Sequence, residues 1–246
     1  MEYYFVSDVH LGLSGDTDGR RMDSFLSFLE EIRGHADGLY LLGDIFDFWV
    51  EYENEIPSGY DAALKELKAL SDSGCRIHFF KGNHDYWTLD YFERELGVEI
   101  VEEPYRVERL NGLDICVGHG DVLGCTSLKA RAVFFLFRNP LLIKVLRKMP
   151  RHWITEFGHW WSARSRKSNS SYTFELDGSD ILDFSEKMAG ERHIDHFIFG
   201  HFHKRVSRKM ECGAHIHILG DWKDGRDYLN LSGTNISGRG LPNTSI

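Results

Sequence analysis

The stretch that decides the fold is residues 39–49, Leu-Tyr-Leu-Leu-Gly-Asp-Ile-Phe-Asp-Phe-Trp. Its first four residues form an apolar run typical of a buried strand, and the glycine after them permits a tight turn. Two carboxylates, Asp44 and Asp47, follow that turn directly. Open α/β sheets bind ligands in the crevice beyond the carboxyl ends of their strands. This stretch therefore predicts a buried strand that delivers acidic side chains to a site.

Four more apolar runs end in a polar cluster of the same kind, and we expect strands at 2–7, 76–80, 113–117 and 196–199. The clusters after them are Asp8-x-His10, Gly82-Asn83-His84-Asp85, Gly118-His119-x-Asp121 and Gly200-His201-x-His203. Apolar residues at helical spacing predict helices near 20–33, 60–72 and 179–189. This alternation of strands and helices predicts an α/β core with all five clusters on one rim.

Further strand signals lie outside these five segments. A hairpin is expected between strands near 105–109 and 113–117, because Asn111-Gly112 is a strong turn pair. We interpret region 212–231 as antiparallel strands. The tail 232–246 is rich in Ser, Gly, Asn and Thr, and we expect it to be irregular.

The five clusters contribute seven side chains with the nitrogen and oxygen donors that bind transition metals. One tetrahedral ion cannot use seven donors, whereas two ions that share a carboxylate can. Imidazole and carboxylate without thiolate suit Mn²⁺, Fe, Zn²⁺ or Co. Two ions about 3.5–4 Å apart would stabilise the attacking and leaving oxygens of a phosphoryl transfer, with a metal-bridging hydroxide as the nucleophile. The seven candidates are Asp8, His10, Asp44, Asn83, His119, His201 and His203.

Each cluster has a simpler explanation when it is taken alone. Asn and Asp favour turns, and a pair of histidines can be one buried and one exposed residue. The five clusters together, in order and each at a strand end, favour the metal site. Six histidines lack a glycine turn beside them and are expected to be structural or surface residues: His35, His78, His193, His196, His215 and His217.

Charge is distributed unevenly along the 246 residues. The formal net charge of −9 argues by itself against polyanionic partners. Residues 125–170, however, hold ten basic residues and one acidic residue, a net of +9, and we call this segment the basic island. The most apolar run of the chain, 132–137, is far shorter than the roughly 20 residues that span a bilayer. We interpret 1–246 as a single domain in which about 125–170 is a helical cap inserted over the core.

Large apolar side chains alternate with the basic ones in the basic island. The plain interpretation is an amphipathic cap that packs on the core and turns a basic face to solvent. Two other interpretations compete with it: a surface for an anionic membrane or acyl chains, and a groove that stacks single-stranded nucleic acid. Dense Leu, Ile and Val beside the aromatic residues favour lipid over nucleic acid.

The ordered motifs resemble those of the calcineurin-like metallophosphoesterases over residues 1–203. The resemblance implies a β-sandwich of two mixed sheets flanked by helices, and two divalent metal ions. One ion would bind Asp8, His10, Asp44 and His203, and the other would bind Asp44, Asn83, His119 and His201. His84 would face the substrate phosphate as a catalytic residue, oriented by Asp85. Asp47 and Asp121 would support the ligands from behind.

A closer resemblance is to the UDP-2,3-diacylglucosamine pyrophosphohydrolases of lipid A biosynthesis. It is carried by Asp8-Val-His-Leu11, by 43–49, by 118–121, by the helical insert and by 163–171. It implies hydrolysis of the pyrophosphate of UDP-2,3-diacylglucosamine to UMP and 2,3-diacylglucosamine 1-phosphate, with manganese as the metal. It also implies a cytoplasmic protein that binds the inner membrane peripherally through the basic island.

The same resemblance implies a set of residues that hold the substrate: Asn83, His84, Arg164, Ser165, Lys167, Asn169 and His201. The best-known members carry arginine at the position of His84, where the wider superfamily has histidine. Two alternatives stay open. One is a metallophosphoesterase that acts on a soluble nucleotide or on DNA, and the other is a scaffold of the same fold without metal. Intact donors at all seven positions argue against the scaffold.

Overall fold

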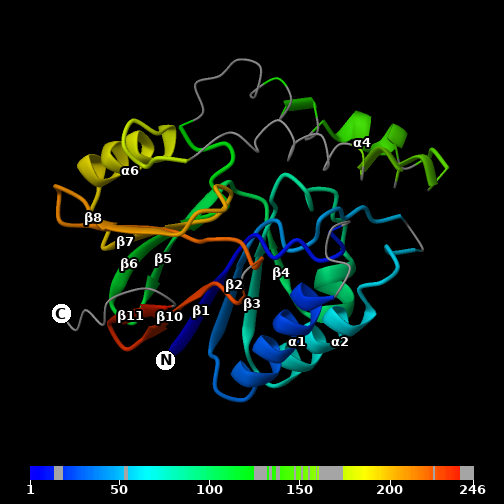
Figure 1. Cartoon of the computed structure of the whole chain (residues 1–246), viewed down its shortest axis with the longest axis horizontal. Coiled ribbons are helices and arrows are strands. Elements are labelled where there is room, and N and C mark those ends of the chain that lie inside the picture. Colours follow the sequence, from blue (N-terminus) through cyan, green and yellow to red (C-terminus); the bar gives the residue numbers. More distant parts are fainter. Residues whose placement is uncertain are drawn as a thin grey trace.

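The computed structural model describes residues 1–13, 19–52, 55–124, 132, 135–136, 139–146, 148–150, 152–154, 156–158, 160, 174–223 and 225–238. Two mixed β-sheets pack face to face, and helices cover their outer faces (Figure 1). The layers are therefore helix, sheet, sheet, helix. This architecture confirms the expected α/β sandwich.

The first sheet has the strand order β11-β10-β1-β2-β3-β4. Strands β1 to β4 are parallel, and β10 and β11 extend the sheet with antiparallel pairing. Helices α1 and α2 pack on its outer face, and a single π-helical turn, η1, precedes β4 (Figure 1). The bounds are β1 Glu2–Val6, α1 Arg20–Ile32, β2 Gly38–Leu42, α2 Asp61–Asp72, β3 Arg76–Phe80, η1 Phe92–Leu96, β4 Glu99–Val101, β10 Tyr228–Ser232 and β11 Asn235–Gly238.

The second sheet has the strand order β5-β6-β7-β9-β8. Strands β6, β7 and β9 are parallel, and the antiparallel strands β5 and β8 form the two edges. Helix α6 covers its outer face (Figure 1). The bounds are β5 Tyr105–Leu110, β6 Leu113–Gly118, α6 Asp180–Glu191, β7 His196–Phe199, β8 Val206–Lys209 and β9 His215–Ile218.

The central strands are buried on both faces, which explains why they are continuous apolar runs in the sequence. Successive side chains of a strand point to opposite faces of its sheet. On β1, Val6 packs toward the helices and Phe5 packs between the two sheets. All five residues of β2 are buried for the same reason. This double burial fixes the strand positions and hence the place where each strand ends.

The predicted helices and strands agree with the structure to within about two residues, whereas one expectation for the C-terminal tail was wrong. Asn111 and Gly112 form the hairpin turn, both with positive φ (50° and 89°). Region 212–231 holds two strands with the expected antiparallel pairing, β9 with β8 and β10 with β1 and β11, although β9 also pairs in parallel with β7 and the two strands lie in different sheets. The tail 232–246 is not irregular throughout, because 235–238 forms β11 against β10.

The basic island is described in part. Helix α4, Pro140–Leu146, lies apart from both sheets (Figure 1). Ile154 is buried against Val50 and Trp87, which lie in the segments that follow β2 and β3. The island therefore contacts the core on the side where the strands end. Among the described residues no helix has the length and apolar character needed to cross a bilayer.

Candidate metal centre

All seven candidate ligands lie at one rim of the sandwich, where five strands end. Asp8 and His10 follow β1, Asp44 follows β2, and Asn83 follows β3 in the first sheet. His119 follows β6, and His201 and His203 follow β7 in the second sheet. Because β1 to β3 are parallel to one another and β6 is parallel to β7, their carboxyl ends bring these side chains together.

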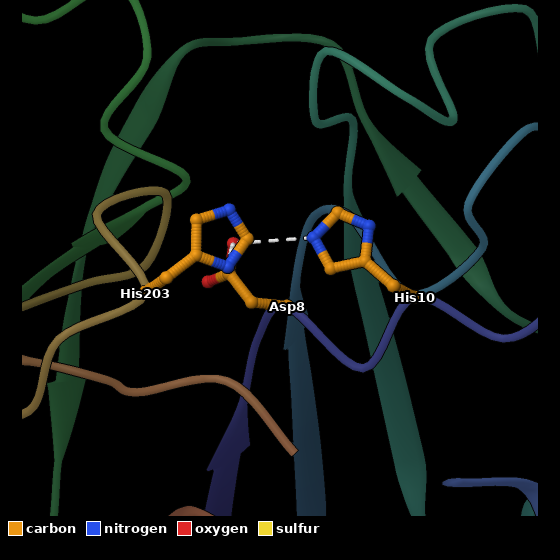
Figure 2. A group of neighbouring side chains, drawn as sticks. All are labelled: Asp8, His10 and His203. Carbon is orange, nitrogen blue, oxygen red and sulfur yellow. Dashed lines mark ion pairs between the residues drawn. The ribbon is translucent and has the colours of Figure 1, made fainter. Parts of the chain in front are cut away.

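One group of ligands is centred on Asp8. Its Oδ1 lies 3.9 Å from Nε2 of His10 and 3.8 Å from Nδ1 of His203. The two imidazole rings are nearly parallel, with centroids 5.0 Å apart. In Figure 2 the Asp8 carboxylate overlaps the His203 ring in this view, and a dashed line joins its oxygen to a ring nitrogen of His10. Three donors that surround one point in this way can hold a cation.

A second group faces the first across Asp44. Oδ2 of Asp44 lies 3.8 Å from Nε2 of His10 and 3.6 Å from Nε2 of His119. Oδ1 of Asn83 lies 3.3 Å from Nε2 of His119 and 3.1 Å from Nδ1 of His201. Asp44 therefore stands between both groups, the position that a bridging carboxylate requires.

Two donor atoms of this site have no other hydrogen-bonding role. Oδ1 of Asp8 and Nε2 of His10 are buried and make no hydrogen bond within the described part of the chain. Buried polar atoms almost always have such a bond, and one without it needs an explanation. Cations held by the two groups would supply the missing interaction, so the residues fit the two divalent ions that the fold family implies.

The backbone is strained at the same residues. Six non-glycine residues of the described chain have φ in the left-handed region, and one of them is the hairpin residue Asn111. The other five are candidate ligands: Asp8 (54°), His10 (51°), Asp44 (53°), His201 (72°) and His203 (53°). Such conformations persist only where surrounding contacts hold them, and they concentrate at functional sites.

Two glycines allow the strand ends to approach one another. A Cβ on Gly43 would lie 2.8 Å from the backbone nitrogen of Gly82 and 2.7 Å from Nδ1 of His119. A Cβ on Gly82 would lie 3.0 Å from Cγ of Asp44 and closer still to the Asp44 amide. The glycines of the sequence motifs therefore make room for the ligands themselves.

The ionisable groups of the site differ in charge: Asp44 is anionic, His119 is protonated and His201 is neutral. Burial acts to raise the pKa of Asp44, but His119, His84 and His10 hold that pKa well below its usual range. Burial acts to lower the pKa of His119, but the carboxylates of Asp44, Asp121 and Asp8 raise it to about 9. Burial and the charge of His119 lower the pKa of His201 to about 3. A cation held by His119 would require that ring to be neutral, so its binding would compete with this proton.

His84 is held by Asp47 and not by Asp85. Its Nδ1 lies 2.8 Å from the carbonyl oxygen of Asp47, and its backbone N–H donates to Oδ1 of Asp44 at 2.9 Å. Because a carbonyl oxygen only accepts, Nδ1 carries a hydrogen, and Nε2 is the atom free to exchange a proton. Nε2 lies 4.0 Å from Oδ2 of Asp44, on the side of the metal ligands.

The expected role of Asp85 therefore needs correction. Its two carboxylate oxygens accept backbone N–H groups from Gly82 at 2.9 Å, Ile45 at 2.7 Å, Asp44 at 3.2 Å and Phe46 at 3.3 Å. The carboxylate thus joins the segment after β2 to the segment after β3. Burial, reinforced by the charge of Asp44, raises the pKa of Asp85 to about 7. Asp47, by contrast, lies 3.5 Å from Nδ1 of His10, and the charge of buried Asp121 raises the pKa of His119, so each acts on a candidate ligand.

Other expected substrate residues lie outside the described residues: Arg164, Ser165, Lys167 and Asn169. Three buried or half-buried residues near the rim were not predicted. Asp221 follows Gly220 at the end of β9, so the strand-end rule could have found it. Arg21 and Glu51 carried no local signal, because charged residues are usually exposed. Glu51 accepts hydrogen bonds from the Trp49 indole and from the backbone of Leu89 and Tyr91.

A small apolar cavity of about 20 Å³ adjoins the metal ligands. It is lined by Phe48, Asn83, His84, Tyr86, Trp87, Phe157 and Gly158. The last two residues belong to the basic island, and a Cβ on Gly158 would lie 2.5 Å from ring carbons of Phe48. The island and the metal rim are therefore in direct contact through Phe48, the residue after Asp47.

Comparisons with known proteins agree with this geometry. The chain is 33% identical over 250 residues to a UDP-2,3-diacylglucosamine hydrolase from Porphyromonas gingivalis (strain ATCC BAA-308 / W83), with 95% of each chain covered. It is 32% identical to a UDP-2,3-diacylglucosamine hydrolase from Serratia proteamaculans (strain 568), with 90% and 91% covered. A solved archaeal phosphodiesterase shares the fold, with a TM-score of 0.50 at 12% identity over 97% of this chain and 98% of that one.

The family model of the calcineurin-like phosphoesterases matches residues 1–205, the part of the chain that contains every strand-end cluster. Because that match covers most of the chain and the rim assembles the donors that such enzymes require, the chain belongs to the calcineurin-like phosphoesterase family.

Proposed function

We propose that this metal-dependent hydrolase cleaves the pyrophosphate bond of UDP-2,3-diacylglucosamine to give UMP and 2,3-diacylglucosamine 1-phosphate. The observation that carries the proposal is the convergence of seven metal donors at one rim, in a chain 33% identical to a UDP-2,3-diacylglucosamine hydrolase. The proposed ligands are Asp8, His10, Asp44 and His203 for one ion and Asp44, Asn83, His119 and His201 for the other. We propose manganese as the metal.

The bound cations would supply Lewis acidity, lower the pKa of a water and offset the charge of the phosphates. The residues of the chain then position and protonate the substrate. His84 keeps its Nδ1 hydrogen on the Asp47 carbonyl, so Nε2 can donate a proton to the leaving phosphate oxygen when the ring is charged. Water adds to one phosphorus and gives up a proton to solvent, the bond from that phosphorus to the bridging oxygen breaks, and the oxygen leaves with the other phosphate.

The basic island is proposed to be a cap, at about 125–170, that accepts the lipid. Its described apolar side chains include several that are strongly exposed: Phe135 (75%), Leu141 (73%), Val145 (60%), Trp153 (55%) and Trp160 (56%). Large apolar side chains exposed in one segment are typical of an interaction site. Lys144 and Lys148 add positive charge to the same segment. These features support binding of acyl chains and of the anionic cytoplasmic face of the inner membrane.

The function is tested with the manganese-loaded protein and UDP-2,3-diacylglucosamine, by following UMP release. Asp8→Ala should abolish release, because it removes the carboxylate ligand that lies next to both His10 and His203. Asp72→Ala removes an exposed carboxylate on α2 and should leave release unchanged. The proposal of a lipid substrate would be wrong if wild type released no more UMP than Asp8→Ala and hydrolysed a dinucleotide or DNA ends faster. The alternative substrates would then be favoured.

The role of the island is tested with a double variant, Phe135→Ser with Leu141→Ser. It should weaken turnover of the diacylated substrate and binding to vesicles that contain anionic lipid. Turnover of bis(p-nitrophenyl) phosphate, which needs only the metal rim, should stay within about twofold, because both side chains are exposed. An equal loss with both substrates would argue against a lipid-binding cap.

A further inference from the structure

Arg21 is a buried arginine in the first turn of α1, with only 6% of its surface exposed. Its Nη1 donates a hydrogen bond of 2.9 Å to the carbonyl oxygen of Val9. Its Nη2 lies 3.5 Å from Oδ2 of Asp221, the residue that follows Gly220 at the end of β9. A buried guanidinium is rare unless it is paired, so its position calls for a specific role.

The carbonyl that Arg21 binds belongs to the residue between two candidate ligands. Asp8 and His10 flank Val9, and both have left-handed φ (54° and 51°). The neighbouring segment holds them through their amides, since Asp8 N–H donates to the Gly43 carbonyl at 3.2 Å and His10 N–H to the Asp44 carbonyl at 3.0 Å. Arg21 donates to the Val9 carbonyl of the same turn, and it does so from the side of α1.

Asp221 completes the arrangement because it offsets the charge of Arg21. A lone guanidinium this close to the rim would oppose the binding of cations. Its pairing with the Asp221 carboxylate, whose side chain is 28% exposed, places a compensating negative charge beside it. The pair also ties three separate segments together: the turn after β1, the start of α1 and the connection after β9.

We propose that Arg21, anchored by Asp221, is a positioning residue that holds the turn of Asp8 and His10 in the geometry needed to bind its metal ion. The inference rests on the proposed function, because it assumes that these ligands bind a cation. Arg21 is not a ligand and does not contact substrate; it acts through the Val9 carbonyl. Residues that orient metal ligands from behind typically contribute about 10–100-fold to metal affinity.

The test measures Mn²⁺ binding by titration calorimetry of metal-free protein, with wild type, Arg21→Met, Arg21→Lys and Asp221→Asn. In wild type we expect two Mn²⁺ per chain. Arg21→Met should weaken one of the two sites by about 10–100-fold and change the other less than about threefold. Arg21→Lys should restore part of the loss, because an ammonium reaches one of the two acceptors. Asp221→Asn should weaken the same site.

Arg33→Met is the matched control. Arg33 follows the last residue of the same helix and pairs with Glu66 at 3.4 Å, away from the turn after β1. It should leave both Mn²⁺ sites unchanged, whatever it does to the unfolding temperature of the metal-free protein. Excess Mn²⁺ should also rescue phosphodiesterase turnover in Arg21→Met, which a loss of folded protein would not permit.

Two outcomes separate the inference from the proposed function. If wild type binds fewer than two Mn²⁺, the proposed function fails first. If wild type binds two and Arg21→Met binds both with wild-type affinity, the positioning role is wrong. Should Arg21→Met not fold, Asp221→Asn decides, because wild-type affinity at both sites in that variant overturns the inference that anchored Arg21 holds the turn.

Discussion

Gly82→Ala is the smallest change that should disable the metal centre, because it adds one methyl group next to the shared carboxylate. The new Cβ would lie 3.0 Å from Cγ of Asp44 and nearer still to its Oδ1 and backbone nitrogen, whereas ordinary contacts begin at 3.4 Å. The backbone nitrogen of Asp44 is held by Asp85 and cannot retreat freely. Relief therefore requires the Asp44 carboxylate to move by about 1 Å.

The expected effect on turnover is large, and the effect on stability is moderate. A shift of about 1 Å in a reacting geometry can lower the rate about 100-fold. Overpacking of a tight site costs about 1–3 kcal/mol of unfolding free energy. Asp44 lies within 4.0 Å of His10, His84 and His119, so its displacement affects both groups of ligands. Mn²⁺ affinity should therefore fall at both sites.

The assay compares Gly82→Ala with Gly190→Ala, an identical chemical change in helix α6. A Cβ on Gly190 would meet nothing within 4 Å, and alanine is the better helix former by about 1 kcal/mol. Gly190→Ala should therefore be as active as wild type and slightly more stable. kcat/KM, Mn²⁺ stoichiometry and urea unfolding are measured on all three proteins. Turnover of Gly82→Ala within threefold of wild type would refute the steric reasoning.

Three further predictions concern buried groups. Burial, together with the charge of His215, lowers the pKa of His196 to about 4. Burial, together with the charge of His196, lowers the pKa of His217 to about 3. At pH values below about 6.5, the usual pKa of histidine, the unfolded chain therefore binds more protons at these two residues than the folded chain does. The unfolding free energy should decrease as the pH is lowered from about 6.5 to 4, by about 1.4 kcal/mol per pH unit for each ring that stays neutral in the folded protein. In urea titrations, His217→Gln should make this pH dependence shallower. Asp85→Asn should lower both Mn²⁺ affinity and unfolding free energy, the latter by about 1–3 kcal/mol, because an amide cannot accept four N–H groups; wild-type affinity would contradict its structural role. His84→Gln should bind two Mn²⁺ normally in calorimetry and lose about 100-fold in kcat, most strongly with poor leaving groups; equal loss with all leaving groups would exclude proton donation.

The sequence predicted the position of the ligands because that position depends on strand ends. A buried run such as 39–42 ends where its apolar residues end, and parallel strands bring such ends to one rim. The same rule, applied to Gly220-Asp221, would have added Asp221 to the rim. The local pattern is less informative there, because β9 pairs in both ways, in parallel with β7 and antiparallel with β8.

Other features depended on tertiary contacts that no local pattern records. Strand β11 exists because Ile236 packs between the sheets, although its sequence is polar and rich in small residues. The family resemblance implies that Asp85 orients His84. Its carboxylate instead satisfies the backbone amides of two loops, an arrangement that only the packing of β2 beside β3 creates.

The left-handed ligands suggest where metal affinity is controlled in this fold. Asp8 Oδ1 and His10 Nε2 lie 3.9 Å apart, and the backbone of both residues turns into the left-handed region. That turn is unfavourable for non-glycine residues and is held by backbone hydrogen bonds from neighbouring segments. Affinity should then depend as much on the side chains that bind backbone, Asp85 and Arg21, as on the ligands. Substitutions that spare every ligand and remove those backbone contacts, such as Asp85→Asn and Arg21→Met, should therefore still weaken Mn²⁺ binding.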